Sequence, residues 1–299
     1  MKKGVYRMSN FVVFTDSVAD FSESYVKALN VEIIPFIFML DNKEYYNHPD
    51  WRDLSVKDFY AALRAGKSAS TTQVNQFRYM EVWEPHLQAG KDVLYICLSS
   101  ALSKSYDQSM LAANEMREKY PERKIYTIDS KAASLGIGLL AYYAAKARDE
   151  GKSVDETAAY VENLVTKLHH WVMVDDLQHL RRGGRISGAK AFVGTMLNVK
   201  PILHITSEGK LTPLTKARGR TKALELLAKQ MEDQKAAPAN QPIFISHSDV
   251  PELAEQLKAM ITAKYGQREF IVNDIGPVIG AHTGPGTIAL IFLGGERRA

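Results

Sequence analysis

The sequence predicts an α/β protein of two domains, the first with a mainly parallel sheet in three layers and the second with a mixed sheet. A chain of 299 residues is long enough for about two domains, and 45% hydrophobic with 24% charged residues is typical of a globular protein. In the first half, short apolar runs alternate with helical patterns, which favours a parallel sheet covered by helices. A hairpin signal in the second half indicates antiparallel strands. The predicted domains are residues 1–168 and 169–299.

The first half opens with a predicted strand at residues 11–15. Asp20, with Glu23 three residues later, resembles a capping box and predicts the start of a helix. The apolar run Val31–Leu40 predicts a second strand, which bends or lies at an edge because Pro35 interrupts it. The further elements predicted in this half are a helix at 56–65 capped by Ser55, a helix around 77–87, strands at 92–98 and 124–128, and helices at 132–149 and 154–168, the last opened by a capping box of Ser153 and Glu156.

Polar side chains follow several of these strands at their carboxyl ends. They lie at Thr15–Ser17, Ser99–Ser105 and Asp129–Ser130. The hydroxyl-rich stretch 67–75 predicts a loop that leads into the cap of the next helix. Because ligands of open α/β sheets bind at the carboxyl ends of the strands, we expect several hydroxyl groups beside one crevice.

The second half begins with a predicted strand at 170–174 and a short helix at 175–180. The basic segment 181–187 then predicts a glycine-broken loop, whose three arginines could hold phosphate or carboxylate. A charge run of this kind is equally typical of a solvated surface. The remaining elements are a hairpin of 202–206 and 210–215 around Ser207-Glu208-Gly209, a helix at 221–231, a loop at 233–240, a strand at 242–246, a helix at 250–264 and a strand at 269–275.

The segment Gly276–Thr287 holds four glycines and two prolines. This content argues against a regular helix or central strand, so we expect a stiff loop between the strand at 269–275 and an apolar run at 288–292. The loop would display the single imidazole of His282. A turn whose histidine only caps a neighbouring backbone is the structural alternative.

Composition excludes several classes of protein. The net charge of +4 and a pI of about 8.9 are weak evidence for nucleic-acid binding, and we expect none. The one cysteine, Cys97, allows no disulfide within the chain and no cysteine metal cluster, which favours a reducing, cytoplasmic location. No apolar run approaches the roughly 20 residues of a membrane span, and no signal-peptide pattern follows Met1 or Met8.

Motifs of known catalytic sites are mostly absent. There is no G-x-S-x-G, H-E-x-x-H, P-loop or dinucleotide-binding fingerprint. His169 and His170 are neighbours on a strand and face opposite ways, so we expect no shared metal, and His247 near Asp249 is a weak candidate for metal or acid–base chemistry. A Ser103–His282 pair would make an acyl hydrolase conceivable.

A binding site is the other reading of the polar residues. Two hydroxyl clusters, Thr71-Thr72 and Ser99–Ser105, together with His282 and Arg185, stand among many apolar elements. Hydroxyl groups could bind an anionic head group while an apolar cavity encloses a tail.

Several motifs along the chain, in this order, resemble one known family. They are Phe14-Thr-Asp-Ser17 with Ala19-Asp20, Ser70-Thr-Thr-Gln73, Ser99-Ser-Ala-Leu-Ser103 with Tyr106, Asp129-Ser130, Leu180-Arg-Arg-Gly-Gly-Arg-Ile-Ser187, Lys200-Pro-Ile-Leu203 and Gly276–Thr287. From about Phe11 onwards the chain resembles the DegV family of fatty-acid-binding proteins.

The resemblance implies a DegV-like (EDD-type) fold with a long-chain fatty acid buried in a tunnel between two domains. By this resemblance Thr71 and Ser103 bind the carboxylate, with Thr72 and Ser100 beside them, and His282 closes the site. Arg185 would face a partner, a bacterial fatty-acid kinase that phosphorylates the presented acid for phospholipid synthesis. Such a protein is a carrier and not an enzyme, with no cofactor or metal besides its lipid.

The chain departs from the family pattern at two places. Lys104-Ser105 stands where the family commonly has Gly-Thr, and Val74-Asn75 where it commonly has Pro-Ser. Besides the carrier and the hydrolase, a lipid-responsive regulator is an alternative, with Arg181–Arg185 as its interaction surface.

Overall fold

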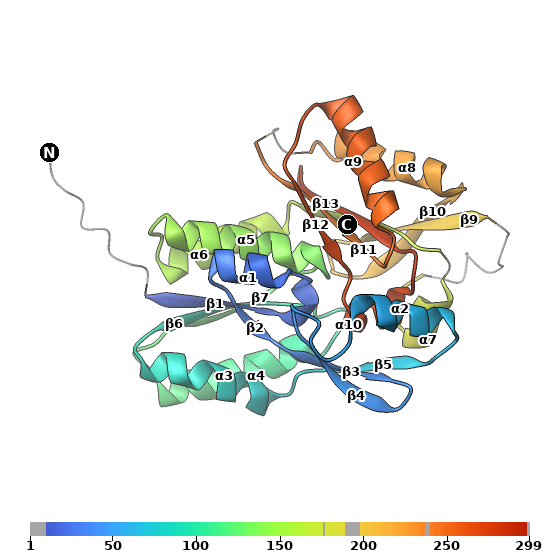
Figure 1. The fold of residues 1–299 in the computed structure, drawn as a ribbon. Coiled ribbons are helices and arrows are strands. Elements are labelled where there is room, and N and C mark those ends of the chain that lie inside the picture. Colours follow the sequence, from blue (N-terminus) through green and yellow to red (C-terminus); the bar gives the residue numbers. More distant parts are fainter. Residues whose placement is uncertain (1–9, 176, 189–197, 237–239, 298–299) are drawn as a thin grey trace, which may run out of the picture.

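The computed structural model describes the chain except for residues 1–9, 176, 189–197, 237–239 and 298–299. Met1, Met8 and part of the predicted loop at 233–240 therefore lie outside the described residues. The described strands form three sheets, of four, six and three strands (Figure 1). None of the described helices is both long and apolar enough to cross a membrane.

The four-stranded sheet has the order β2-β1-β6-β7, and every neighbouring pair is parallel, as predicted. In Figure 1, α3 and α4 cover one face of this sheet, and α1, α5 and α6 cover the other. Its strands are β1 (Phe11–Asp16), β2 (Glu32–Ile34), β6 (Asp92–Cys97) and β7 (Ile125–Asp129). Its helices are α1 (Glu23–Leu29), α3 (Gln76–Gln88), α4 (Ser105–Lys119), α5 (Leu135–Asp149) and α6 (Val154–Val165), and the short 3₁₀ helix η1 (Ser17–Ala19) follows β1.

The six-stranded sheet is mixed, as predicted, in the order β10-β9-β8-β13-β11-β12. Only the β11–β12 pair is parallel, and β9 and β10 form the expected hairpin. Helices α8 and α9 pack together beside this sheet, while α5 contacts β11 and β13 as well as β1 (Figure 1). The elements are β8 (Leu168–Met173), α7 (Gln178–Gly183), β9 (Val199–Ile205), β10 (Leu211–Arg218), α8 (Arg220–Asp233), β11 (Ile243–His247), α9 (Pro251–Tyr265), β12 (Phe270–Asp274), α10 (Pro277–Thr283) and β13 (Ile288–Leu293).

A small antiparallel sheet, β4-β3-β5, was not predicted. The run Val31–Leu40 divides at Pro35, so that β2 joins the parallel sheet and β3 (Phe36–Leu40) pairs with β4 (Lys43–Asn47). The stretch 67–75 is not entirely a loop, because Ala69–Thr72 forms β5 against β3. Threonine suits an extended strand, and pairing with β3 supplies the hydrogen bonds that a short polar stretch lacks by itself. Helix α2 (Val56–Arg64) connects β4 to β5.

The helix start predicted at Asp20 is wrong. Ser22 caps α1 and accepts a hydrogen bond from the Tyr25 backbone. Asp20 is instead buried, with a φ of 53°. The predicted caps by Ser55 and by Ser153 with Glu156 are confirmed, since each serine accepts a hydrogen bond from the backbone three residues on.

The two glycine-containing segments of the second half are also more helical than predicted. Within Gly276–Thr287, residues Pro277–Thr283 form α10, which carries His282 in its last turn. Proline is favourable in the first turn of a helix because the first N–H groups need no helical partner. Similarly, α7 includes Arg181–Gly183, which were expected in a loop.

The domain boundary at 168/169 stays a prediction. Strand β8 begins at Leu168, close to that position. Helix α10 packs against β3 and β5 of the small sheet, and α5 contacts strands of both larger sheets. The two halves of the chain therefore share an extensive boundary, and the candidate site lies along it.

Candidate functional site

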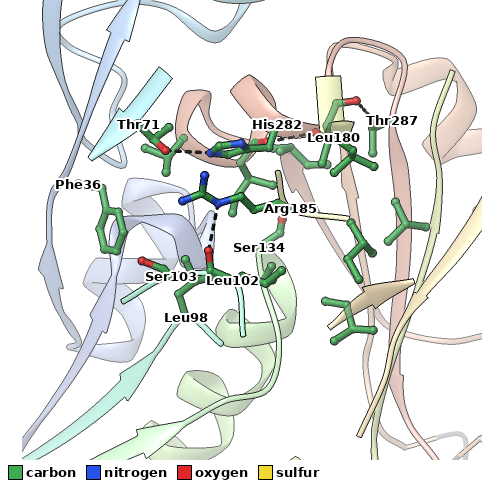
Figure 2. A pocket seen from close by; sticks show the side chains of 18 of the residues that line it. Phe36, Thr71, Leu98, Leu102, Ser103, Ser134, Leu180, Arg185, His282 and Thr287 are labelled. Atoms are coloured by element: carbon green, nitrogen blue, oxygen red, sulfur yellow. Dashed lines mark hydrogen bonds between the residues drawn. The ribbon is translucent and has the colours of Figure 1, made fainter. Parts of the chain in front are cut away.

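A cavity of about 280 Å³ lies between the parallel sheet, the mixed sheet and α10. Figure 2 shows Arg185 between Thr71 and His282 above and Ser103 below, with the side chains of Leu98 and Leu102 beside Ser103. Leu98 and Leu102 from the first half and Leu180, Val172, Ile205 and Leu211 from the second are among the apolar residues that line it. Polar and apolar side chains thus line the same cavity.

Thr71 and His282 form the polar contact nearest α10. Thr71 on β5 and His282 on α10 are linked by a hydrogen bond of 2.8 Å between Oγ1 and Nε2 (Figure 2). Burial, and secondarily the positive charge of Arg185, lowers the pKa of His282 to about 4. The imidazole is therefore neutral near pH 7 and can donate or accept one hydrogen bond at Nε2.

Helix α7 fixes the position of that imidazole. A Cβ atom on Gly183 would lie 2.2 Å from Nδ1 of His282, so only glycine allows the two helices to approach this closely. Among the described residues, Nδ1 has no hydrogen-bond partner. The close packing leaves Nε2 as the ring nitrogen that faces Thr71.

Ser103 lies at the start of α4, opposite His282. Its Oγ lies 3.0 Å from Oγ of Ser105 and accepts a hydrogen bond of 3.2 Å from the Ser105 backbone N–H. Ser105 in turn accepts a hydrogen bond of 3.3 Å from the Val74 N–H. The two departures from the DegV pattern, at 74–75 and 104–105, are thus in direct contact beside Ser103.

Two cations lie at the mouth of the cavity. Arg185 is exposed, donates from Nε to the Leu102 carbonyl at 3.2 Å, and extends between Thr71 and Ser103 (Figure 2). Lys104 also lines the cavity, but its ammonium pairs with Asp107 at 3.0 Å in an exposed position. Both charges favour an anion near Thr71 and Ser103, and solvent screens both contributions because both side chains are exposed.

Of the two remaining predicted site residues, Thr72 and Ser100, only Thr72 lines the cavity. Ser100 is not among the residues that line it: its Oγ accepts a hydrogen bond of 3.3 Å from Lys131, and its N–H donates to Asp129. Ser100 therefore lies within hydrogen-bonding distance of a neighbouring ion pair and not of the cavity.

Sequence reasoning assigned no binding role to five polar residues of the cavity: Gln73, Ser134, His170, Thr283 and Thr287. Gln73, Thr283 and Thr287 lie within the motifs of the DegV resemblance, whereas Ser134 and His170 do not. Ser134, just before α5, donates a hydrogen bond of 2.5 Å to Asp20. The polar stretch after β7 pointed towards this region but not to Ser134 itself. In the sequence, His170 stands out only as the neighbour of His169.

The geometry gives little support to an acyl hydrolase at Ser103 and His282 or to a metal or acid–base site at His247. No hydrogen bond joins Ser103 to His282 within the described residues, because the imidazole contacts Thr71 and the serine contacts Ser105. Asp249 pairs with Arg64, and the His247 ring lies 3.2 Å from Asp274. The described part of the chain contains no group of three or more side chains placed to hold a metal ion.

Comparison with known proteins identifies the family. The sequence profile of the DegV family, described as an uncharacterised protein family, matches residues 10–294. A DegV domain-containing protein of Clostridium perfringens is 46% identical over 287 residues, which cover 96% of this chain and 98% of the relative.

Solved structures agree with this result. A DegV family protein from Thermus thermophilus, described in terms of fatty-acid binding, superposes with a TM-score of 0.86 at 30% identity, over 95% of this chain and 99% of that one. DegV from Bacillus subtilis, described as a fatty-acid-binding protein, has a TM-score of 0.80 at 28% identity, over 96% and 99% of the two chains. The chain with the cavity between its two large sheets belongs to the DegV family.

Proposed function

We propose that the protein binds a long-chain fatty acid, with the tail in the apolar part of the cavity and the carboxylate at Thr71, His282 and Ser103. The observation that carries this proposal is that hydroxyl and imidazole side chains line the same cavity as many aliphatic side chains. The fatty-acid binding of the related structures supports the same ligand class.

The physical chemistry of the site is consistent with such a ligand. Burial of the tail contributes about 0.8 kcal/mol per methylene, so a tail of sixteen carbons contributes on the order of 10 kcal/mol before ordering costs. A buried carboxylate needs several hydrogen-bond donors, because an unpaired charge is costly in an apolar environment. The hydroxyls of Thr71 and Ser103 and the neutral imidazole of His282 would donate, while Thr72 lies nearby and Arg185 adds positive charge.

We further propose that the protein is a cytoplasmic carrier without catalysis of its own, which presents the carboxylate to a partner fatty-acid kinase. Arg185 supports this role because it is exposed and contacts the backbone beside Ser103. It could therefore contact both the head group and a docked partner. The kinase would form acyl phosphate, which phospholipid synthesis consumes.

Native mass spectrometry of the purified protein, with organic extraction of any adduct, tests the binding proposal. We expect a stoichiometric fatty acid in the wild type and reduced retention in Thr71→Ala and Ser103→Ala. Thr215→Ala, an exposed hydroxyl of β10 outside the cavity, is the matched control. A lipid-free wild type that takes up no added fatty acid would refute the proposed ligand. Unchanged retention in both variants would refute the assigned residues.

Kinase dependence is tested separately. The lipid-loaded protein should yield acyl phosphate only when a fatty-acid kinase and ATP are added, and Arg185→Glu should lower that yield without emptying the cavity. Hydrolysis of acyl esters by the protein alone would instead support the hydrolase.

A further inference from the structure

His170 lines the acyl cavity and also a second, smaller cavity of about 170 Å³ beside Arg297, and the proposed head-group site does not use it. It lies on β8 and, like Val172 two residues later, lines the cavity, so both side chains lie on the same face of the strand. In the sheet, Val172 pairs with Ala289 and His170 pairs with Ile291. Strand β13 starts near the end of α10 and leads away from it, and Ile291 comes later in β13 than Ala289. His170 is therefore farther than Val172 from α10 and its His282.

The imidazole of His170 has no protein partner where it lies. The side chain is only 3% exposed, and within the described residues no hydrogen bond joins either ring nitrogen to another group. Nδ1 faces the backbone of Gly136 on α5, where an added Cβ would lie 2.9 Å away. Burial, with a smaller effect of the Arg297 charge, lowers the pKa of His170 to about 3, so the ring is neutral at physiological pH.

The surroundings indicate which nitrogen carries the proton. Nδ1 faces the carbon of a glycine, a contact that suits a lone pair, because C–H groups are weak donors and not acceptors. The proton is then on Nε2, which, unlike Nδ1, is not among the fully buried and unpaired side-chain atoms of the described residues. A saturated tail offers this N–H no acceptor, and a buried donor without an acceptor is unfavourable.

We propose that His170 is a specificity residue for fatty acids that carry an oxygen atom along the chain, as a hydroxyl or oxo group, which accepts a hydrogen bond from Nε2. This inference rests on the proposed fatty-acid binding and narrows its ligand class. A site built to bind an oxygen discriminates against the analogue that lacks it, because its own polar group is then left unpaired. The neighbouring Val172 and Ala289 provide no competing polar group.

Competitive displacement of a fluorescent fatty acid tests the proposal. The probes are octadecanoic acid and a series of hydroxyoctadecanoic acids with the hydroxyl at successive positions along the chain. We expect at least one isomer to bind the wild type about tenfold more tightly than octadecanoic acid, as one additional buried hydrogen bond would give. In His170→Leu that isomer should lose its advantage, while octadecanoic acid should bind at least as well as before.

His204→Leu is the matched control. It removes another imidazole of the same sheet, one that stacks on Trp171 and does not line the acyl cavity, and it should keep the wild-type preference. A wild type that binds octadecanoic acid and prefers no hydroxylated isomer would overturn this inference and leave the proposed function intact. A wild type that binds none of these acids would overturn the proposed function itself. The wild-type comparison decides the proposal even when His170→Leu fails to fold.

Discussion

At the scale of single residues, Ser105 explains how two departures from the DegV pattern occur together. Its buried hydroxyl accepts from the Val74 N–H and contacts Ser103. Proline, expected at position 74, has no N–H to donate. Valine at 74 and serine at 105 are therefore a matched pair, and their contact holds the hydroxyl of Ser103 at the cavity.

Substitution of Ser105 tests that pairing. Ser105→Ala leaves the buried Val74 N–H without its acceptor, so we expect the free energy of unfolding to fall by about 1–3 kcal/mol. Fatty-acid retention should fall as well, because Ser103 loses its neighbour. Ser105→Thr retains the hydroxyl and should keep retention near the wild-type value. Denaturant titration and native mass spectrometry measure the two effects, and full retention in Ser105→Ala would show that Ser103 is positioned independently.

At the scale of elements, the apolar strands were predictable and the glycine-containing segments were not. Strand β1 contains the apolar run Phe11–Phe14 and β6 the run Val93–Cys97, and such runs are typical of buried parallel strands. Helix α10 depends on a tertiary contact: a Cβ on Gly280 would lie 2.4 Å from the hydroxyl oxygen of Tyr60. No local pattern reveals that an aromatic ring from α2 requires this space.

Some residues of the candidate site were predictable from the sequence and others were not. Thr71, Ser103 and His282 were named from motifs, and the structure places all three on one cavity. Their residue types made them candidates, and the resemblance to a known family assigned their roles as carboxylate-binding residues. Ser134 and His170 lack such a motif, and only the packing of α5 and β8 brings them to the cavity. Hydrogen-bond partners such as Asp20 and Ser134 are 114 residues apart in the chain.

The contact between α7 and α10 provides a prediction at this scale. In Gly183→Ala the new methyl group would collide with the His282 ring, so the ring must shift and its hydrogen bond to Thr71 should weaken. Alanine otherwise favours a helix by about 1 kcal/mol relative to glycine, so stability should change little. We expect weaker fatty-acid retention by native mass spectrometry with a small change in melting temperature.

Arg182→Ala is the control for this substitution. It changes an exposed side chain on the same helix without filling the space beside His282. Full lipid retention in Gly183→Ala would contradict the role of α7 in holding the imidazole.

At the scale of the whole molecule, Asp20 joins distant parts of the chain at the boundary between the two large sheets. Its carboxyl group accepts hydrogen bonds from Ser134, before α5, and from the Gly276 N–H, before α10. Its backbone carbonyl accepts from Asn273 on β12. Burial is the main cause that raises the pKa of Asp20, to about 8, against the hydrogen bonds that lower it. The carboxyl group that connects the two halves is therefore protonated near pH 7.

This protonation makes the stability of the molecule depend on pH. The Asp20 pKa is about 8 in the folded chain and near the ordinary 3.8 in the unfolded chain, so the folded state binds more protons between these values. The contribution of Asp20 to the free energy of unfolding is therefore greatest below pH 4 and falls as the pH rises to about 8. Its slope is at most about 1.4 kcal/mol per pH unit.

Asp20→Asn should remove that part of the slope, because the amide has a similar shape and stays neutral. Wild type and Asp20→Asn must be compared with each other, because Asp16 also makes stability depend on pH. Burial raises the pKa of Asp16 to about 7, so Asp16 lowers the stability of both proteins as the pH rises. Denaturant titrations at a series of pH values between 5 and 9 bracket the folded pKa of about 8. As the pH rises through this range, the free energy of unfolding of Asp20→Asn should increase relative to that of the wild type. Parallel curves for the two proteins would mean that Asp20 ionises alike in the folded and unfolded chains, and the buried acid would then not couple the two halves to pH.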